Sequence, residues 1–292
     1  MIYLESFRLA SEQNETEYLF HSRKLDMTCH AVNNPYPFKI FPFKHLSRLD
    51  FAPITLLYGG NGSGKSTILN IIAQKLQLAR TSPYNRTPFF EDYLGYCRAV
   101  LANDKRPPDG SCIITSDDVF DFMLNFRTLN EGVDRKREEL FDEWYNLRQG
   151  SFQMRSLEDL EELQRRRDAW KNTRSDFTAR RIPQNLPGQS NGENAYGYFA
   201  EKIRGNALYL LDEPENSLSP ARQIELASFL EDSARFYGCQ FIISTHSPFL
   251  LAIRKAKIYD LDSRPVTTKL WTELANTRLY FEFFEAHRDE FI

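Results

Sequence analysis

The chain has 292 residues, 41% of them hydrophobic and 14% aromatic, so it can bury a sizeable core and is not disordered as a whole. Its 37 basic residues nearly balance 40 acidic ones, and the net charge of −3 excludes nucleic-acid binding through a global positive field. The four cysteines lack zinc-site spacing, and no apolar run suits a signal peptide or a membrane span, so we expect a cytoplasmic protein with no membrane partner.

The N-terminal region is predicted to form β structure. Residues 2–9 alternate imperfectly between apolar and polar side chains, which predicts a strand, and residues 18–31 are a candidate for its antiparallel neighbour. Prolines restrict the aromatic segment 36–43 to extended chain or an edge strand. We expect its rings to pack in the core or over a sheet more readily than to stack on an adenine base.

A glycine-rich loop at residues 59–67 follows the apolar run 54–58 and leads into a helical pattern of apolar residues. The spacing G-x-x-x-x-G-K-[ST] is typical of loops whose successive backbone N–H groups hold nucleotide phosphates. In such loops the lysine, here Lys65, reaches the β- and γ-phosphates, and the hydroxyl of Ser66 binds Mg²⁺. The predicted nucleotide-binding residues are Gly59, Gly60, Asn61, Gly62, Ser63, Gly64, Lys65, Ser66 and Thr67.

Asp117 has two interpretations. Residues 112–115 predict a short buried strand, and residues 116–118 are typical of a helix cap, so Asp117 is a capping residue in the first interpretation. In the second, its carboxylate lies near the bound metal, because it stands between the phosphate loop and the later motifs.

The segment 131–185 is predicted to be a helical insertion, a subdomain within a single domain over residues 1–292. Apolar residues recur at helical spacing at positions 140, 144 and 147, and again at 157, 160, 163 and 170, among many charged residues. Basic clusters at 135–137 and 165–167 either form a solvated face, neutralised by neighbouring glutamates, or contact phosphates or an acidic partner.

Three later segments predict parts of one ligand site. Ser190 can cap the helix that follows it, whose N-terminus offers free N–H groups to an anion. Residues 207–213 form an apolar run that ends in two carboxylates, which is typical of a buried parallel strand whose carboxyl end faces a ligand crevice. At this end Asp212 would bind Mg²⁺ beside Ser66, and Glu213 would orient or deprotonate the attacking water. A second apolar strand delivers His246 to the same crevice. Taken alone, this residue is either an imidazole that contacts a γ-phosphate or a merely structural histidine.

The C-terminal region continues with a predicted strand at 257–261 and an aromatic, helical tail at 270–292. The tail is interpreted either as core packing or as a partner surface.

The order of these motifs resembles the ABC class of P-loop ATPases over most of the chain outside 131–185. The loop at 59–67 matches that class's G-x-N-G-S-G-K-S-T motif, residues 208–214 match its strand-D-E-P motif, and residues 244–248 match its histidine switch. Residues 190–193 resemble the signature motif L-S-G-G-Q, with departures at 189 and 191, and residues 216–219 stand where the class has its dimer-contacting loop. The class's glutamine loop has no clear match, and Asp117 is a candidate for its place.

The resemblance implies an α/β P-loop NTPase fold of ABC type, with a mostly parallel central sheet, an antiparallel N-terminal β portion and the charged helical insertion. It also implies ATP and Mg²⁺ as cofactors and a homodimer that sandwiches two ATP molecules. Each ATP would bind the phosphate loop of one chain and Ser190 and Gly192 of the other, with Glu193 in the same motif. The catalytic residues would be Glu213, His246 and Lys65.

Within the class, the chain resembles soluble ATPases of chromosome maintenance, repair and overcoming-lysogenisation type, and small bacterial ATPases of which some are paired with nucleases in phage defence. The implied function is an ATP-hydrolysing switch that dimerises around nucleotide and controls a separate effector, a nuclease or a toxin, in phage defence or DNA maintenance. Two alternatives stay open: the nucleotide-binding subunit of a membrane transporter, which the charged insertion fits poorly, and an ATP-dependent scaffold that binds DNA directly.

Overall fold

The computed structural model describes residues 1–21, 35–149, 152, 159–182 and 191–291. Their contacts divide the chain into two compact units, Met1–Phe120 with Asn191–Ile292 and Asp121–Ser190, and each is described by itself. Helix α5 (Ser116–Gln149) contributes residues to both units. Within the described part of the chain, no helix is long and apolar enough to cross a bilayer.

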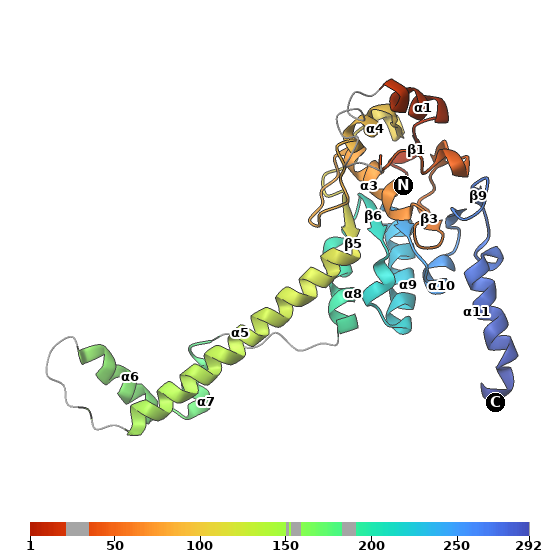
Figure 1. Cartoon of the computed structure of the whole chain (residues 1–292). Coiled ribbons are helices and arrows are strands. Elements are labelled where there is room, and N and C mark those ends of the chain that lie inside the picture. Colours follow the sequence, from red (N-terminus) through yellow and green to blue (C-terminus); the bar gives the residue numbers. More distant parts are fainter. Residues whose placement is uncertain (22–34, 150–151, 153–158, 183–190, 292) are drawn as a thin grey trace. The chain divides into compact units, whose positions relative to one another are not determined.

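The first unit is built on a six-stranded sheet with the order β5-β6-β7-β3-β8-β9. Strands β5, β6, β3 and β9 of this sheet are labelled in Figure 1. Its strands are β3 (Ile54–Tyr58), β5 (Cys112–Thr115), β6 (Leu208–Asp212), β7 (Gln240–Ser244), β8 (Lys257–Asp260) and β9 (Thr267–Thr268). All neighbours pair in parallel except β9, which is antiparallel to β8. Every residue of β3 and β7 is buried, which explains their continuous apolar sequence, because a parallel sheet is covered on both faces.

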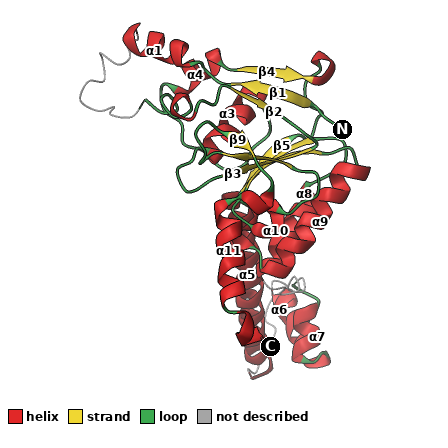
Figure 2. Cartoon of the chain, turned by 90° about the vertical axis from the view of Figure 1, so that its right-hand side faces the viewer, coloured by secondary structure: helices red, strands yellow, loops and turns green. Residues whose placement is uncertain are grey.

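An antiparallel sheet with the order β2-β1-β4 forms the second layer of strands. Its strands are β1 (Leu4–Arg8), β2 (Arg48–Asp50) and β4 (Arg98–Leu101). Helix α3 (Lys65–Leu76) packs between this sheet and the six-stranded one (Figure 2). The predicted α/β fold, a mostly parallel central sheet with an antiparallel N-terminal β portion, is confirmed.

One buried amide ties the two sheets together. The Gln240 Oε1 atom at the start of β7 accepts the backbone N–H groups of Tyr3 at 2.8 Å and Leu4 at 2.9 Å. Its Nε2 group donates to the Leu4 carbonyl at 2.9 Å. Because Gln240 is fully buried, these bonds satisfy polar groups that would otherwise be costly to remove from water.

Two of the remaining helices of the first unit begin at a serine that is followed by a proline. Ser219 and Ser247 each precede a proline at the first helical position, and each accepts a backbone N–H of the helix that it caps. The helices are α1 (Glu12–His21), α4 (Phe90–Tyr96), α8 (Asn191–Lys202), α9 (Pro220–Phe236), α10 (Pro248–Leu251) and α11 (Ala275–Ala286). The 3-10 turns are η1 (Pro42–Lys44), η2 (Ala102–Asp104), η4 (Pro214–Ser217), η5 (Trp271–Glu273) and η6 (Arg288–Phe291).

The predicted strand partner of β1 at residues 18–31 is wrong. Residues 12–21 form α1, residues 22–34 lie outside the described residues, and β1 pairs with β2 and β4. The hydroxyl of Ser11 accepts the N–H of Asn14 at 3.2 Å, and two glutamates stand in the first turn, so the local sequence favours a helix start.

The aromatic segment 36–43 is not an edge strand. It forms a turn that leads into η1, and Phe38 and Phe41 are buried in the core, as expected of the rings. Phe38 stacks on Tyr18 of α1 with ring centroids 4.6 Å apart and meets Tyr93 of α4 edge-on at 5.0 Å. The segment therefore serves as an apolar anchor between two helices.

The second unit is a helical assembly of α5, α6 (Leu160–Lys171) and α7 (Arg174–Ala179). Its small core holds Leu140, Leu147, Ala169 and Phe177. The predicted second apolar stripe is wrong, because the described members Leu160, Leu163 and Trp170 are exposed and position 157 lies outside the described residues. The buried residue of α6 is instead Ala169, whose small side chain permits a close helix contact.

The basic clusters of this unit contact neighbouring acids. Arg166 lies 3.1 Å from Glu162, and Arg165 lies 3.7 Å from Glu143. Lys136 lies 3.0 Å from Glu139. Most of these side chains are exposed, although that of Arg166 is not, and the pairs support the interpretation of a solvated, charge-neutralised face.

Glu15 of α1 leads to a prediction about stability and pH. It is 3% exposed, its Oε2 accepts the Lys39 N–H at 2.6 Å, and burial raises its pKa from 4.5 to about 7. The folded state therefore holds this proton more tightly than the unfolded state, and the stabilisation is complete below about pH 4.5 and lost as pH rises through 7. We expect Glu15→Gln to raise the free energy of unfolding at pH 8 by about 1–3 kcal/mol, with little change at pH 5. Urea midpoints at the two pH values measure this, and an equal pH dependence in both proteins would contradict it.

Candidate nucleotide-binding site

The sheet order brings three loops to one edge. Strand β7 lies between β3 and β6, with Ser244 opposite both Leu57 and Asp212 in register. Because the carboxyl ends of parallel strands meet at the same edge, the phosphate loop after β3, Glu213 after β6 and His246 after β7 face one crevice. The crevice lies at the position where α/β sheets bind ligands.

Glycine is required at two positions of the phosphate loop. Gly62 and Gly64 have φ angles of 78° and 96°, in the region that side chains disfavour. A Cβ atom at Gly64 would also lie 3.2 Å from the ring of Phe41 and 3.3 Å from Ile40. Gly64 is the N-cap of α3, so the loop leads its backbone N–H groups directly into a helix N-terminus, the feature that phosphate binding needs.

Asp262 contacts the loop and was not foreseen from the sequence. Its Oδ2 atom accepts the N–H of Gly60 at 2.7 Å. It follows β8, the neighbour of β3 on the other side from β7, so its carboxylate reaches the loop from a strand that the motifs do not mark.

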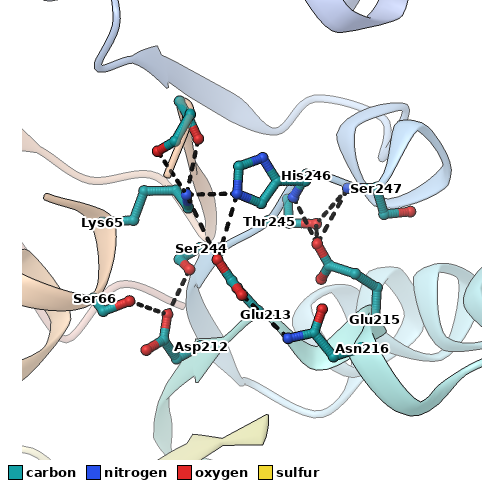
Figure 3. A network of polar contacts seen from close by, with 12 residues as sticks. Lys65, Ser66, Asp212, Glu213, Glu215, Asn216, Ser244, Thr245, His246 and Ser247 are labelled. Atoms are coloured by element: carbon teal, nitrogen blue, oxygen red, sulfur yellow. Dashed lines mark hydrogen bonds and ion pairs between the residues drawn. The ribbon is translucent and has the colours of Figure 1, made fainter. Parts of the chain in front are cut away.

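Lys65 lies inside the site and is 4% exposed. Its ammonium donates to the carbonyls of Gly59 at 2.8 Å and Gly60 at 3.3 Å. The same nitrogen lies 2.7 Å from His246 Nε2 and 3.6 Å from Glu213 Oε1 (Figure 3). One buried cation therefore joins the phosphate loop to the residues that follow β6 and β7.

Asp212 and Ser66 form a pair of oxygen donors. The Asp212 Oδ1 atom accepts the hydroxyl of Ser66 at 3.0 Å and that of Ser244 at 2.6 Å. Burial raises the pKa of Asp212, while the two hydroxyl bonds and the nearby Lys65 favour its charged form. A carboxylate and a hydroxyl side by side, next to a phosphate loop, fit the ligands that Mg²⁺ prefers.

Glu213 stands at the centre of the polar network. Its φ of 49° places it in the left-handed region, just after the strand, and this turns its side chain towards Lys65 and His246. Its Oε1 atom lies 3.4 Å from His246 Nε2, and its Oε2 atom accepts the side-chain N–H of Asn216 at 3.1 Å. A carboxylate held in this way can accept a proton from a reacting group in the crevice.

Glu215 is a second residue that sequence reasoning missed. Its Oε1 atom accepts the Thr245 hydroxyl at 2.8 Å and the backbone N–H groups of His246 at 2.6 Å and Ser247 at 3.2 Å (Figure 3). The side chain is 8% exposed, and burial raises its pKa. Glu215 therefore positions the backbone that carries His246. The available signal was a third carboxylate in Asp-Glu-Pro-Glu, directly after the strand-D-E-P motif.

Asp117 is exposed, unlike the buried site residues Lys65 and Glu215. It lies near the start of α5, two residues beyond Thr115, whose backbone pairs in register with Asp212. The neighbouring Asp118 makes the capping contact, since its Oδ2 accepts the Thr115 N–H at 2.7 Å.

The predicted signature segment is only partly described. Ser190 lies outside the described residues. Residues 191–193, which include Gly192 and Glu193, form the first turn of α8, and this helix packs against α9 and η4.

Two family models match the chain. Residues 129–252 match the model described as AAA domain, putative AbiEii toxin, Type IV TA system, and residues 38–90 match a second AAA-domain model. The second match contains the phosphate loop, and the first contains Asp212, Glu213 and His246, so each side of the crevice lies in AAA-type sequence. Together with the geometry of the site, these two matches support an ABC-class P-loop ATPase. Families of this kind generally hydrolyse ATP.

Solved structures similar to this chain include two SMC head domains. The one from Pyrococcus furiosus, bound to the C-terminal domain of ScpA, is 14% identical with a TM-score of 0.44, and the match covers 99% of this chain and 100% of that one. The one from Thermotoga maritima is 14% identical with a TM-score of 0.41, covering 92% and 99%. A putative metal-chelate type ABC transporter in an inward-facing conformation is 17% identical with a TM-score of 0.37, covering 79% and 77%. No curated protein matches the chain.

Proposed function

We propose that this ATPase binds and hydrolyses ATP with Mg²⁺, dimerises around the nucleotide and thereby controls a partner effector. The observation that carries the proposal is the meeting of Lys65, Glu213 and His246, with Ser66 and Asp212 beside them, at one edge of the sheet. These are the parts that phosphoryl transfer needs: a phosphate cradle, a metal site and a carboxylate beside them.

The loop 59–67 would hold the phosphates of ATP through its backbone N–H groups and Lys65, and Ser66 and Asp212 would hold the metal. Bound Mg²⁺ supplies neutralisation of the charge on the β- and γ-phosphates. Glu213 accepts a proton from the attacking water, and Asn216 holds the other oxygen of its carboxylate in place. His246 Nε2 lies nearer to the Lys65 ammonium than to Glu213, so it accepts a hydrogen bond from Lys65 and keeps that cation beside the carboxylate.

The proposed dimer completes each site from the other chain. The first turn of α8, with Gly192 and Glu193 after Ser190, would contribute N–H groups and a hydroxyl to the γ-phosphate bound by the partner copy. Residues 216–219, between the site carboxylates and α9, would lie against the partner. The effector would be a nuclease or a toxin in phage defence or DNA maintenance; the model described as a putative AbiEii toxin supports the defence setting. Direct DNA contact would be a further property of the complex.

A mixing experiment tests the shared site. Lys65→Ala and Ser190→Arg are each expected to abolish ATP hydrolysis, because every site of a uniform dimer then lacks one part. In a mixed dimer, one site pairs the intact Lys65 of one chain with the intact Ser190 of the other, so we expect hydrolysis to return on mixing. Steady-state phosphate release measures it.

The matched control mixes Lys65→Ala with Glu213→Gln. Both residues belong to the same half of the site, so no mixed dimer contains an intact site and no activity should return. If mixing Lys65→Ala with Ser190→Arg also restores nothing while light scattering shows that dimers form, the shared site is refuted.

A further inference from the structure

A large apolar pocket adjoins the candidate site. It encloses about 850 Å³ between η4, α9, α10, η5 and α11 of the first unit, a volume typical of ligand pockets. Five aromatic rings line it, from Phe249, Trp271, Tyr280, Phe281 and Phe284. The polar or charged lining residues are Glu215, Gln223, His246, Ser247, Thr272, Thr277 and Arg278.

Two buried polar atoms of this lining have no partner among the described residues. They are the Oε2 atom of Glu215 and the Oγ1 atom of Thr277, and each residue is only 8% exposed. Gln223 and Ser247 are satisfied, since the Gln223 amide donates to the Leu218 carbonyl at 2.9 Å and accepts the Ser247 hydroxyl at 2.7 Å. An unpaired buried carboxylate oxygen is costly, so the part of the pocket that Glu215 lines is suited to a hydrogen-bond donor with a positive charge.

The aromatic walls suit the same kind of ligand. Rings carry a negative face that attracts ammonium and guanidinium groups, and their area shields the apolar stem that such groups carry. Phe281 and Phe284 are 69% and 54% exposed, so the stem would cover apolar surface that now faces water. Arg278 is the one basic side chain besides His246 among the lining residues, is exposed, and lies in no ion pair with Glu215 in the described structure. Its charge opposes a bound cation.

We propose that this pocket binds a cationic group on an apolar stem, an ammonium or a guanidinium, with the charge at Glu215 and Thr277 and the stem against the aromatic rings. Such a group belongs either to a free organic amine or to a basic side chain of a partner protein, and the two sources are separated below.

The pocket is coupled to the candidate site through one carboxylate. Glu215 lines the pocket, its Oε2 atom has no partner among the described residues, and its Oε1 atom accepts the backbone N–H groups of His246 and Ser247. A cation that binds the carboxylate of Glu215 alters the hydrogen bonds that position His246 beside Lys65 and Glu213. Pocket occupancy therefore changes the rate of ATP hydrolysis; this second part rests on the proposed function, whereas binding itself does not.

Binding is tested without nucleotide. The probe is 2-phenylethylamine, titrated into the full-length protein and followed by ligand-observed NMR, with a dissociation constant expected in the range of about 0.1–1 mM. The neutral analogue 2-phenylethanol and the anion 3-phenylpropanoate keep the ring but lack the positive charge. We expect each to bind at least about 10-fold more weakly than the amine. Equal binding of all three, or no saturable binding of the amine, overturns the proposal.

Variants assign the site. Glu215→Gln and Phe281→Ala should each weaken binding of the amine about 10-fold, and Arg278→Ala should strengthen it, because a competing cation is removed. Phe236→Ala is the matched control, since Phe236 is 65% exposed on α9 and is not part of the lining. If Glu215→Gln does not fold, the affinities of Thr277→Val and Arg278→Ala for the amine test the proposal instead. Unchanged binding in Phe281→Ala and Arg278→Ala would place the amine elsewhere and refute the assignment.

Two further measurements separate the source and the coupling. A capped Phe-Arg-Phe peptide that binds about 10-fold more tightly than the amine, and loses this when citrulline replaces arginine, assigns the pocket to a protein side chain; equal affinity assigns it to a free amine. Saturating probe should change phosphate release at least twofold in the wild type and not in Phe281→Ala. Binding without any change in hydrolysis refutes the coupling alone, and absence of hydrolysis in the unliganded protein refutes the proposed function instead.

Discussion

Glu213→Gln is expected to lower ATP turnover by about 10²–10⁴-fold while ATP binding is retained, the range typical of losing a general base. Glu213 lies 3.6 Å from Lys65 and 3.4 Å from His246, and glutamine keeps the size and the contact with Asn216 but accepts no proton. ATP therefore stays bound, and the dimer that closes around it should accumulate. Turnover is measured by phosphate release, and the dimer by light scattering with ATP and Mg²⁺.

The matched control is Glu225→Gln, which changes the same chemical group at an exposed position of α9, where Glu225 pairs only with Arg222 among the contacts described for it. This variant should behave as the wild type does. If Glu213→Gln stays monomeric at micromolar concentration with ATP and Mg²⁺, the nucleotide sandwich is wrong. Near-normal ATP turnover in the Glu213→Gln variant would instead show that Glu213 is not the general base.

Asp212→Asn is expected to remove the dependence of nucleotide binding on Mg²⁺. In the wild type, Mg²⁺ should strengthen ATP binding, and in the variant this gain in affinity should be smaller by about 10-fold or more. The reason is that mutating even a residue that only orients a metal ligand typically lowers metal affinity about 10–100-fold. Asparagine keeps an acceptor for Ser66 and Ser244 but lacks the negative charge. Titration of a fluorescent ATP analogue with Mg²⁺ and with EDTA measures the difference.

Asp232→Asn serves as the comparison, because Asp232 is an exposed carboxylate of α9 away from the crevice residues. An Mg²⁺ effect of wild-type size in Asp212→Asn would show that the metal binds elsewhere, and Asp117 would then be the next carboxylate to change. Loss of ATP binding in EDTA as well would point to damage of the loop rather than of the metal site.

Much of the site was predictable because its residues are placed by local rules. The glycine loop after an apolar strand predicts a phosphate cradle, since the positive φ angles at Gly62 and Gly64 and the helix start at Lys65 depend on a few neighbouring residues. An apolar run that ends in Asp212 and Glu213 predicts a buried parallel strand with carboxylates at its end. Parallel strands then bring such ends together whatever the loops between them contain.

Other features escaped because they depend on contacts between distant residues. Leucine spacing predicted a second apolar stripe, yet Leu160 and Leu163 face solvent, while Ala169 and Phe177 fill the core. Periodicity says which residues share a face, and it does not say which face is covered. The strand partners of β1 come from residues 48–50 and 98–101, and no local signal joins these segments to residue 4.

The sequence by itself predicted the P-loop ATPase class, the parallel strands and the residues of the candidate site around the phosphate loop, since these predictions follow from motifs whose geometry is local. Only the tertiary structure decided that Asp262 holds the loop, that Glu215 holds His246, and that the aromatic tail forms a pocket with an unpaired carboxylate oxygen. Each of these is a contact across many residues of sequence, and burial, which makes an unpaired polar atom costly, exists only once the chain is packed.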